Sequence, residues 1–145
     1  MRHKNICRLL AVSVDGPRRC LLLSLCSGGD LLHRIKKKDP MLTCPQRVQI
    51  MLGILLALQH LHSVNMIHRD VKTQNVLLSR ADISGEDMLP LTKLADFGTV
   101  RDDVRHRKLS NKTTGTDNIQ SHASTKQVIG TRPYMSPEYL TLGQV

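Results

Sequence analysis

Aromatic side chains are nearly absent from this sequence of 145 residues, which has no Trp, one Phe and two Tyr. Folds that bind RNA or single-stranded DNA stack the bases on aromatic side chains, so the composition argues against that class of protein. Apolar residues make up 40% of the chain and can build a core, but an aliphatic one. The length corresponds to one domain at most, or to a piece of a larger one.

Long apolar runs and cysteine clusters are missing as well. The two longest apolar runs, residues 20–26 and 50–58, are far shorter than the ~20 residues that span a bilayer, so we expect no membrane segment in this chain. The four cysteines form no C-x-x-C pair and no zinc-binding spacing. Such sparse use of cysteine is typical of reduced thiols, and it favours a cytoplasmic location.

Positive charge is in excess. Lys and Arg number 21 and Asp and Glu number 12, so the formal net charge is +9. A nucleotide phosphate, a nucleic acid and an acidic peptide would each suit such a surface, so the charge alone does not select a function. A nucleic-acid binder would depend on this charge only, because the sequence contains no nucleic-acid-binding motif, and we expect no nucleic-acid partner.

Turn residues predict the local structure of the N-terminal part of the chain. The apolar segments 6–14 and 20–25 flank Asp15-Gly16, which is typical of a β-hairpin. A break at residues 27–30 follows, and residues 31–38 then predict a short helix with a basic C-terminal end.

A longer helix is predicted to begin after Thr43. Thr43 and Gln46 have the spacing of a capping box, and Pro45 lies in the first turn. The spacing of the following apolar residues predicts an amphipathic helix of about five turns, buried over much of its surface. The residues of this apolar stripe are Val48, Met51, Leu52, Leu55, Leu58 and Leu61.

The second half of the chain is less regular. Residues 76–78 and 91–95 predict two short strands, separated by a polar loop at residues 80–90. Residues 101–127 are basic and rich in Ser and Thr, so we expect them to be mobile unless something orders them. Regular structure is expected to resume near residues 128–130.

Three motifs follow one another in this second half. They are His68-Arg69-Asp70-Val71-Lys72-Thr73-Gln74-Asn75, then Asp96-Phe97-Gly98, then Gly130-Thr131-Arg132-Pro133-Tyr134-Met135-Ser136-Pro137-Glu138. Together they resemble the catalytic loop, the metal-binding triplet and the end of the activation segment of eukaryotic protein kinases. A single short motif arises often by chance, but the three in this order are specific.

This resemblance implies a set of catalytic residues. Asp70 would accept the proton of the substrate hydroxyl and orient it, and Lys72 would lie beside the γ-phosphate of ATP. Asn75 and Asp96 are oxygen ligands suited to Mg²⁺, and the resemblance makes them the metal ligands. Thr131 would hydrogen-bond towards Asp70 and Lys72 and form the floor beneath the substrate residue.

The resemblance also implies a nucleotide site. Residues 24–30 are similar to the hinge between the two kinase lobes, with Leu23 as the gatekeeper just before it. The backbone of Ser24 and Cys26 would then hydrogen-bond the adenine of ATP. Asp30 would reach the ribose, and Leu77 would form the floor under the base.

The implied fold is α+β and protein-kinase-like, but partial. Residues 1–23 would be small-lobe strands, residues 24–30 the hinge, and residues 31–145 the large lobe through the activation segment. The sequence contains no G-x-G-x-x-G and no Lys in a Val-Ala-Ile-Lys-like strand, and it stops soon after Glu138. We therefore expect an incomplete kinase domain, which by itself has little or no activity.

Serine/threonine kinases have a Lys two residues after the catalytic Asp and a Gly-Thr pair before the Pro-Glu motif. Lys72 and Gly130-Thr131 resemble this pattern. The amino-acid sequences of these motifs are most similar to those of the tyrosine-kinase-like group, which includes plant receptor-like kinases. The substrate would be a protein, and the chain would be cytoplasmic or the cytoplasmic part of a longer receptor-like protein.

Arg69 beside Asp70 is typical of kinases that are controlled by phosphorylation of the activation segment, here residues 96–138. An activating kinase is therefore an expected partner. The hydroxyl residues on which it could act are Ser110, Thr113, Thr114, Thr116, Ser121, Ser124 and Thr125.

Two alternatives stay open. A truncated kinase form could act as a non-catalytic interaction or regulatory protein, which a complete transcript would distinguish from a kinase fragment. A metal site at His60, His62 and His68 is conceivable, but no carboxylate or Cys lies at ligand spacing, so packing and hydrogen bonding are favoured for these side chains.

Overall fold

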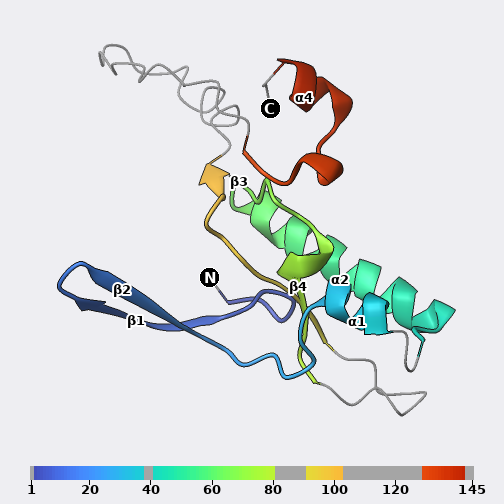
Figure 1. Ribbon diagram of the computed structural model, residues 1–145, viewed down its shortest axis with the longest axis horizontal. Coiled ribbons are helices and arrows are strands. Elements are labelled where there is room, and N and C mark those ends of the chain that lie inside the picture. The colour runs from blue at the N-terminus through green and yellow to red at the C-terminus, as the bar shows by residue number, and fades with distance from the viewer. Residues whose placement is uncertain (1, 38–40, 81–90, 103–128, 143–145) are drawn as a thin grey trace.

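The computed structural model describes residues 2–37, 41–80, 91–102 and 129–142. These residues form a mixed α/β structure with three two-stranded antiparallel sheets among them (Figure 1). Most of the predicted loop at 80–90, nearly all of the segment predicted to be mobile and all seven candidate phosphorylation hydroxyls lie outside the described residues.

The predicted hairpin is present, as β1 (Leu9–Asp15) and β2 (Arg18–Leu23). Asp15 pairs with Arg18, and Gly16 takes the positive φ of 55° that this tight turn needs. Every residue of both strands is exposed, and Figure 1 shows the hairpin extending away from the helices.

The hairpin begins later than predicted, because Ile6 belongs to the core instead. Ile6 forms a parallel bridge with Leu94 and is only 4% exposed. On either side of this bridge, Leu94 N–H donates to Asn5 O and Cys7 N–H donates to Leu94 O, both at 2.8 Å. The N-terminal segment is thereby joined to the second half of the chain.

Both predicted helices are present and are capped by side chains. The amide of His33 donates to Asp30 Oδ1 at 2.8 Å at the start of α1 (Leu31–Lys37). At the start of α2 (Cys44–Ser63), the Thr43 hydroxyl accepts from the Gln46 amide while the Gln46 side chain accepts from the Thr43 amide. The predicted capping box is therefore confirmed, since two amides that the helix cannot satisfy find partners.

The core lies between α2 and the sheet of β4 (Val76–Leu78) and β5 (Thr92–Leu94). Gly53 lets the helix approach closely, because a Cβ at this position would lie 2.8 Å from the Thr92 Cβ. The buried residues of α2 are Ile50, Gly53, Ile54, Ala57 and Leu61.

The prediction that α2 is buried over much of its surface is wrong within the described structure. Val48, Met51, Leu52 and Leu55 are 66%, 55%, 48% and 57% exposed. The helix is apolar on nearly every side, so the spacing of its residues could not select the face that packs against the sheet. None of the described helices is long and apolar enough to cross a bilayer.

Two histidines join the N-terminal segment to α2, and they predict a pH dependence of stability. The rings of His3 and His60 stack with their centroids 4.8 Å apart, and the Asn5 amide donates to His3 Nδ1 at 3.2 Å, so Nδ1 carries no proton. Burial, the nearby His60 and the nearby Lys4 together lower the pKa of His3 below its ordinary 6.5.

As the pH falls towards 6.5, the unfolded chain therefore takes up a proton at His3 before the folded chain does, and the free energy of unfolding should decrease. Thermal unfolding between pH 7.5 and 5.5 measures this loss. His3→Gln should reduce it, whereas the same change at the exposed His33 should leave it intact. An equal pH dependence in all three proteins would contradict the assignment.

Candidate active site

The loop between β3 (Met66–Ile67) and β4 carries most of the predicted catalytic residues. Its backbone is unusual at Arg69, whose φ is +68°, a value that residues other than glycine rarely adopt. Gly130 lies directly against this loop with φ +123°, and a Cβ there would be 2.7 Å from Arg69 O. Only glycine allows the segment that carries Thr131 to come this close.

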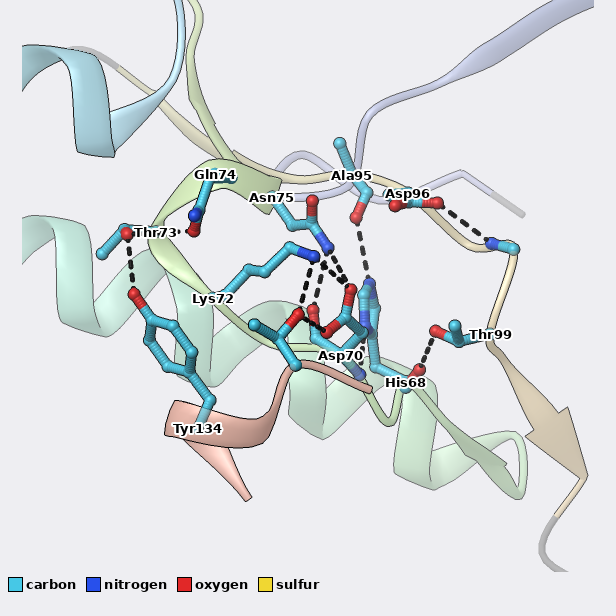
Figure 2. Close-up of polar contacts among 12 residues, drawn as sticks. His68, Asp70, Lys72, Thr73, Gln74, Asn75, Ala95, Asp96, Thr99 and Tyr134 are labelled. Atoms are coloured by element: carbon cyan, nitrogen blue, oxygen red, sulfur yellow. Dashed lines mark hydrogen bonds and ion pairs between the residues drawn. The ribbon is translucent and has the colours of Figure 1, made fainter. Parts of the chain in front are cut away.

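Asp70, Lys72 and Thr131 form a closed hydrogen-bonded triangle (Figure 2). Lys72 Nζ lies 2.7 Å from Asp70 Oδ2 and 2.8 Å from Thr131 Oγ1. The Thr131 hydroxyl donates to Asp70 Oδ1 at 2.7 Å. Thr131 comes from a segment 61 residues further along the chain than Asp70, so the fold assembles this triangle.

Asn75 completes the surroundings of Asp70. Its side-chain nitrogen donates to the backbone oxygen of Asp70 at 2.9 Å and to Asp70 Oδ2 at 3.1 Å. All four residues predicted to be catalytic, Asp70, Lys72, Asn75 and Thr131, are therefore brought together.

The surroundings of Asp70 favour its charged form. Burial acts to raise the pKa of this carboxyl, but hydrogen bonds from Lys72, Thr131 and Asn75 and the charge of Lys72 outweigh it and lower the pKa below its ordinary value. Asp70 is thus an ionised carboxylate at neutral pH, held in one orientation by three donors.

The two predicted metal ligands lie at the same end of the β4–β5 ladder. Asn75 directly precedes β4 and Asp96 follows β5 by two residues, and Ala95 N–H donates to Asn75 O at 2.8 Å. Asp96 has a φ of +62°, and its Oδ1 accepts from the Gly98 amide at 3.3 Å. Asp96 Oδ2 and the Asn75 amide oxygen, which faces away from Asp70 in Figure 2, are the oxygens suited to Mg²⁺.

His68 is fixed as a neutral side chain within the core. Its Nε2 lies 3.1 Å from Ala95 O, which can only accept, and its Nδ1 accepts from the Asp70 amide at 3.4 Å. Burial lowers the pKa of His68, and its ring packs edge-on against Phe97.

The histidine alternative gains no support from the described residues. Within them no three His, Cys, Asp or Glu side chains gather closely enough to hold a metal ion. His68 uses both ring nitrogens, and His60 stacks on His3. These contacts are the packing and hydrogen bonding that the sequence favoured.

Three of the residues predicted to bind the nucleotide, Ser24, Cys26 and Asp30, belong to the segment that precedes α1, and a fourth, Leu77, lies in β4. Asp30 and Leu77 form an isolated antiparallel bridge, which places these two predicted residues side by side. The Asp30 carboxylate caps α1 through Oδ1, a role that was not predicted from the sequence.

Ser24 and Cys26 precede this bridge. The Ser24 amide donates to Arg8 O at 2.8 Å, while among the described residues its carbonyl oxygen accepts only the weak thiol donors of Cys7 and Cys26, at 3.6 and 3.8 Å. A stronger donor could therefore displace these thiols from the Ser24 oxygen.

Three contacts near the site were not anticipated from the sequence. The Arg69 Nε–H donates to Thr99 O at 2.6 Å, and the Thr99 hydroxyl donates to His68 O at 2.8 Å. The hydroxyls of Thr73 and Tyr134 lie 2.9 Å apart, although the two residues are 61 positions apart in the sequence. Residue type and local spacing carry no signal for such long-range pairs.

The comparison with known families agrees with this geometry. The family model described as the protein kinase domain matches residues 1–145. The chain belongs to the protein kinase family. The predicted resemblance is thereby confirmed, and the mixed α/β structure is that of a partial kinase domain.

Curated relatives of this kinase domain include plant receptor-like kinases. "Cysteine-rich receptor-like protein kinase 1" of Arabidopsis thaliana is 35% identical over 150 residues, which cover 100% of this chain and 21% of the relative. "Probable serine/threonine-protein kinase PBL20" of the same plant is 33% identical over 100% of this chain and 32% of its own length.

A relative from an animal has a similar identity. "Serine/threonine-protein kinase pelle" of Drosophila melanogaster is 30% identical over 100% of this chain and 26% of its own length. The chain thus spans between about a fifth and a third of the length of these three relatives. The named relatives are serine/threonine or receptor-like kinases, in agreement with the group that the motifs resembled.

Proposed function

We propose that this kinase chain contributes the acceptor-steering and magnesium-holding part of an enzyme that transfers the γ-phosphoryl group of ATP to Ser and Thr hydroxyls of proteins. In this reaction the bond between the γ-phosphorus and its bridging oxygen breaks, a bond to the substrate oxygen forms, and ADP leaves. The observation that carries the proposal is the triangle of Asp70, Lys72 and Thr131.

Asp70 orients the substrate hydroxyl. A carboxylate with a lowered pKa is a weak base, but it is a good hydrogen-bond acceptor for an alcohol. That suits phosphoryl transfer, whose loose transition state needs alignment more than early removal of the proton. The proton passes to Asp70 as the new phosphorus–oxygen bond completes.

Lys72 and Thr131 hold Asp70 and line the place where the phosphate arrives. Lys72 carries a fixed positive charge 2.7 Å from the Asp70 carboxylate, and this charge can also attract the γ-phosphate oxygens. Thr131 fixes the second carboxylate oxygen and forms the floor beneath the substrate residue.

Asn75 and Asp96 would hold Mg²⁺. The ion, when bound, neutralises charge on the ATP phosphates. The chain's contribution is two hard oxygens at one end of the β4–β5 ladder, with Asn75 fixed by its bonds to Asp70 and Asp96 by its bond to the Gly98 amide.

The nucleotide base would lie along residues 24–30. The carbonyl of Ser24 and the backbone of Cys26 would bond adenine, Leu77 would lie beneath the base, and Asp30 Oδ2 would reach the ribose. The weak thiol contacts at the Ser24 oxygen and the bridge between Asp30 and Leu77 support this placement. ATP and Mg²⁺ are then the cofactors of the complete site.

The chain divides accordingly into small-lobe strands (1–23), a hinge (24–30) and the start of the large lobe (31–145). By itself it should transfer little phosphate, because its sequence contains neither a glycine-rich loop nor the strand lysine that binds the α- and β-phosphates. A protein substrate, an activating kinase that acts on residues 96–138 and a cytoplasmic location complete the proposal.

A chimeric enzyme tests this function. Residues 1–145 would replace the matching segment of the Arabidopsis "Cysteine-rich receptor-like protein kinase 1", of which they cover 21%. The folded chimera should transfer phosphate from ATP to Ser and Thr of a protein substrate in the presence of Mg²⁺. A folded but inactive chimera, or phosphate found on Tyr alone, would contradict the proposal.

A non-catalytic interaction protein is the second candidate. It is favoured by the hairpin β1–β2, which is exposed along its whole length and carries many large apolar side chains. The same chimera separates the two candidates, because an interaction protein does not need the triangle of Asp70, Lys72 and Thr131 to support phosphoryl transfer.

A further inference from the structure

The hydroxyls of Tyr134 and Thr73 belong to a directed chain of hydrogen bonds. The Thr73 hydroxyl donates to Gln74 Oε1 at 3.3 Å, and it lies 2.9 Å from the phenol oxygen of Tyr134 (Figure 2). A threonine hydroxyl has one proton, so Thr73 must accept from Tyr134. We name this chain, from Tyr134 through Thr73 to Gln74, the hydroxyl relay.

The hydroxyl relay joins two short turns that carry the active-site residues. Thr73 begins η1 (Thr73–Asn75), immediately after Lys72. Tyr134 ends η2 (Arg132–Tyr134), and its backbone amide donates to Thr131 O at 2.9 Å. One residue therefore holds Thr131 through its backbone and the catalytic loop through its side chain.

Among the described residues, few other hydrogen bonds hold the segment of residues 129–142 in place. The hydrogen bonds that join residues 129–142 to the rest of the described chain are made by the side chains of Thr131 and Tyr134. Tyr134 is 51% exposed, so burial of its ring contributes little to the attachment. The hydroxyl of Tyr134 thus supplies the second hydrogen-bonded attachment of residues 129–142 to the rest of the described chain.

We propose that Tyr134 is a positioning residue, which through the hydroxyl relay holds Thr131 in contact with Asp70 and Lys72. The catalytic part of this inference rests on the proposed function, whereas the structural part does not. Two attachment points remove the rotation that a single point would allow, and misplacement of a catalytic group by even a small distance costs rate.

Hydrogen exchange in the complete 145-residue chain tests the structural part. Tyr134→Phe removes the donated proton and keeps the ring, so the backbone amide of residue 134 should exchange about twofold to tenfold faster. Thr73→Val should have the same effect, whereas Thr73→Ser keeps the hydroxyl and should retain slow exchange. The double variant Tyr134→Phe/Thr73→Val should exchange no faster than either single variant.

Tyr139→Phe is the matched control. It is the same chemical change in the same segment, but within the described structure the Tyr139 hydroxyl bonds only to the backbone of Ile129. It should therefore speed the exchange of the Ile129 amide and leave residue 134 unchanged. Unchanged exchange at residue 134 in Tyr134→Phe, or additive effects in the double variant, would overturn the relay.

The chimeric kinase tests the catalytic part. Tyr134→Phe should lower kcat about threefold to tenfold without changing the KM for ATP, and Thr73→Ser should stay close to the parent rate. An unchanged kcat, or a loss confined to KM, would overturn the positioning role. An inactive parent chimera would instead contradict the proposed function, while the exchange measurement would still decide the relay.

Discussion

Asp70→Asn should lower the rate of phosphoryl transfer by the chimeric kinase by about 10²- to 10⁴-fold. Both carboxylate oxygens of Asp70 act as acceptors, Oδ1 for Thr131 and Oδ2 for Lys72 and Asn75. An Asn side chain offers one acceptor oxygen, so one of these donors would face an NH₂ group. The variant also loses the negative charge that balances Lys72 and attracts the substrate hydroxyl.

Initial rates with a protein substrate at saturating Mg²⁺ and ATP measure this effect. Circular dichroism should show the fold unchanged, because Asp and Asn have nearly the same shape. Asp15→Asn, the same change in the exposed hairpin turn, should leave the rate unaltered. A chimera that kept more than about a tenth of its rate after Asp70→Asn would rule out the role given to this carboxylate.

Gly28→Ala should cost about 3 kcal/mol of folding free energy, near the upper end of what overpacking causes. A Cβ at Gly28 would overlap Arg80 O and would lie 2.6 Å from Leu78 Cβ and 2.7 Å from Leu78 O. Leu78 is fully buried, so it cannot move aside. The Gly28 amide also donates to Leu78 O at 3.0 Å, and this bond would be strained or lost.

Gly29→Asn is the matched control for this substitution. Gly29 has a φ of +69°, which Asn tolerates better than most residues, and nothing lies within 4 Å of its Cβ position. The substitution should lower the free energy of unfolding by less than about 1 kcal/mol. Urea unfolding of the full chain measures both values, and equal costs at the two positions would contradict close packing of residues 28–30 against β4.

Local signals predicted a large part of the fold. Asp15-Gly16 predicted the hairpin, and Thr43 with Gln46 predicted the capping box, because each feature depends on residues close together in sequence. The order of the three motifs predicted that Asp70, Lys72, Asn75 and Thr131 would meet, although that inference came from resemblance to a family.

Features that depend on distant residues were missed. Nothing in the hydropathy of Ile6 indicated a bridge to Leu94, and the uniform apolarity of α2 hid its core-facing side. One local signal was also overlooked, because Asp30 was assigned to the ribose although its position just before Leu31 makes it a helix cap. Pairings such as Tyr134 with Thr73 are set by how the segments pack, which a single sequence does not encode at any fixed spacing.

The site itself can be examined most directly with Mn²⁺·ATP and an isotope-labelled sample of the 145-residue chain. The paramagnetic ion broadens the NMR signals of nearby nuclei. We predict selective broadening of the Asn75 side-chain amide and of the backbone amides at Asp96 and Gly98, reversed by excess Mg²⁺·ATP and absent in Asp96→Asn. Broadening at Asn75 and Asp96 that is no stronger than in the exposed hairpin would contradict a nucleotide-bound metal between these two residues.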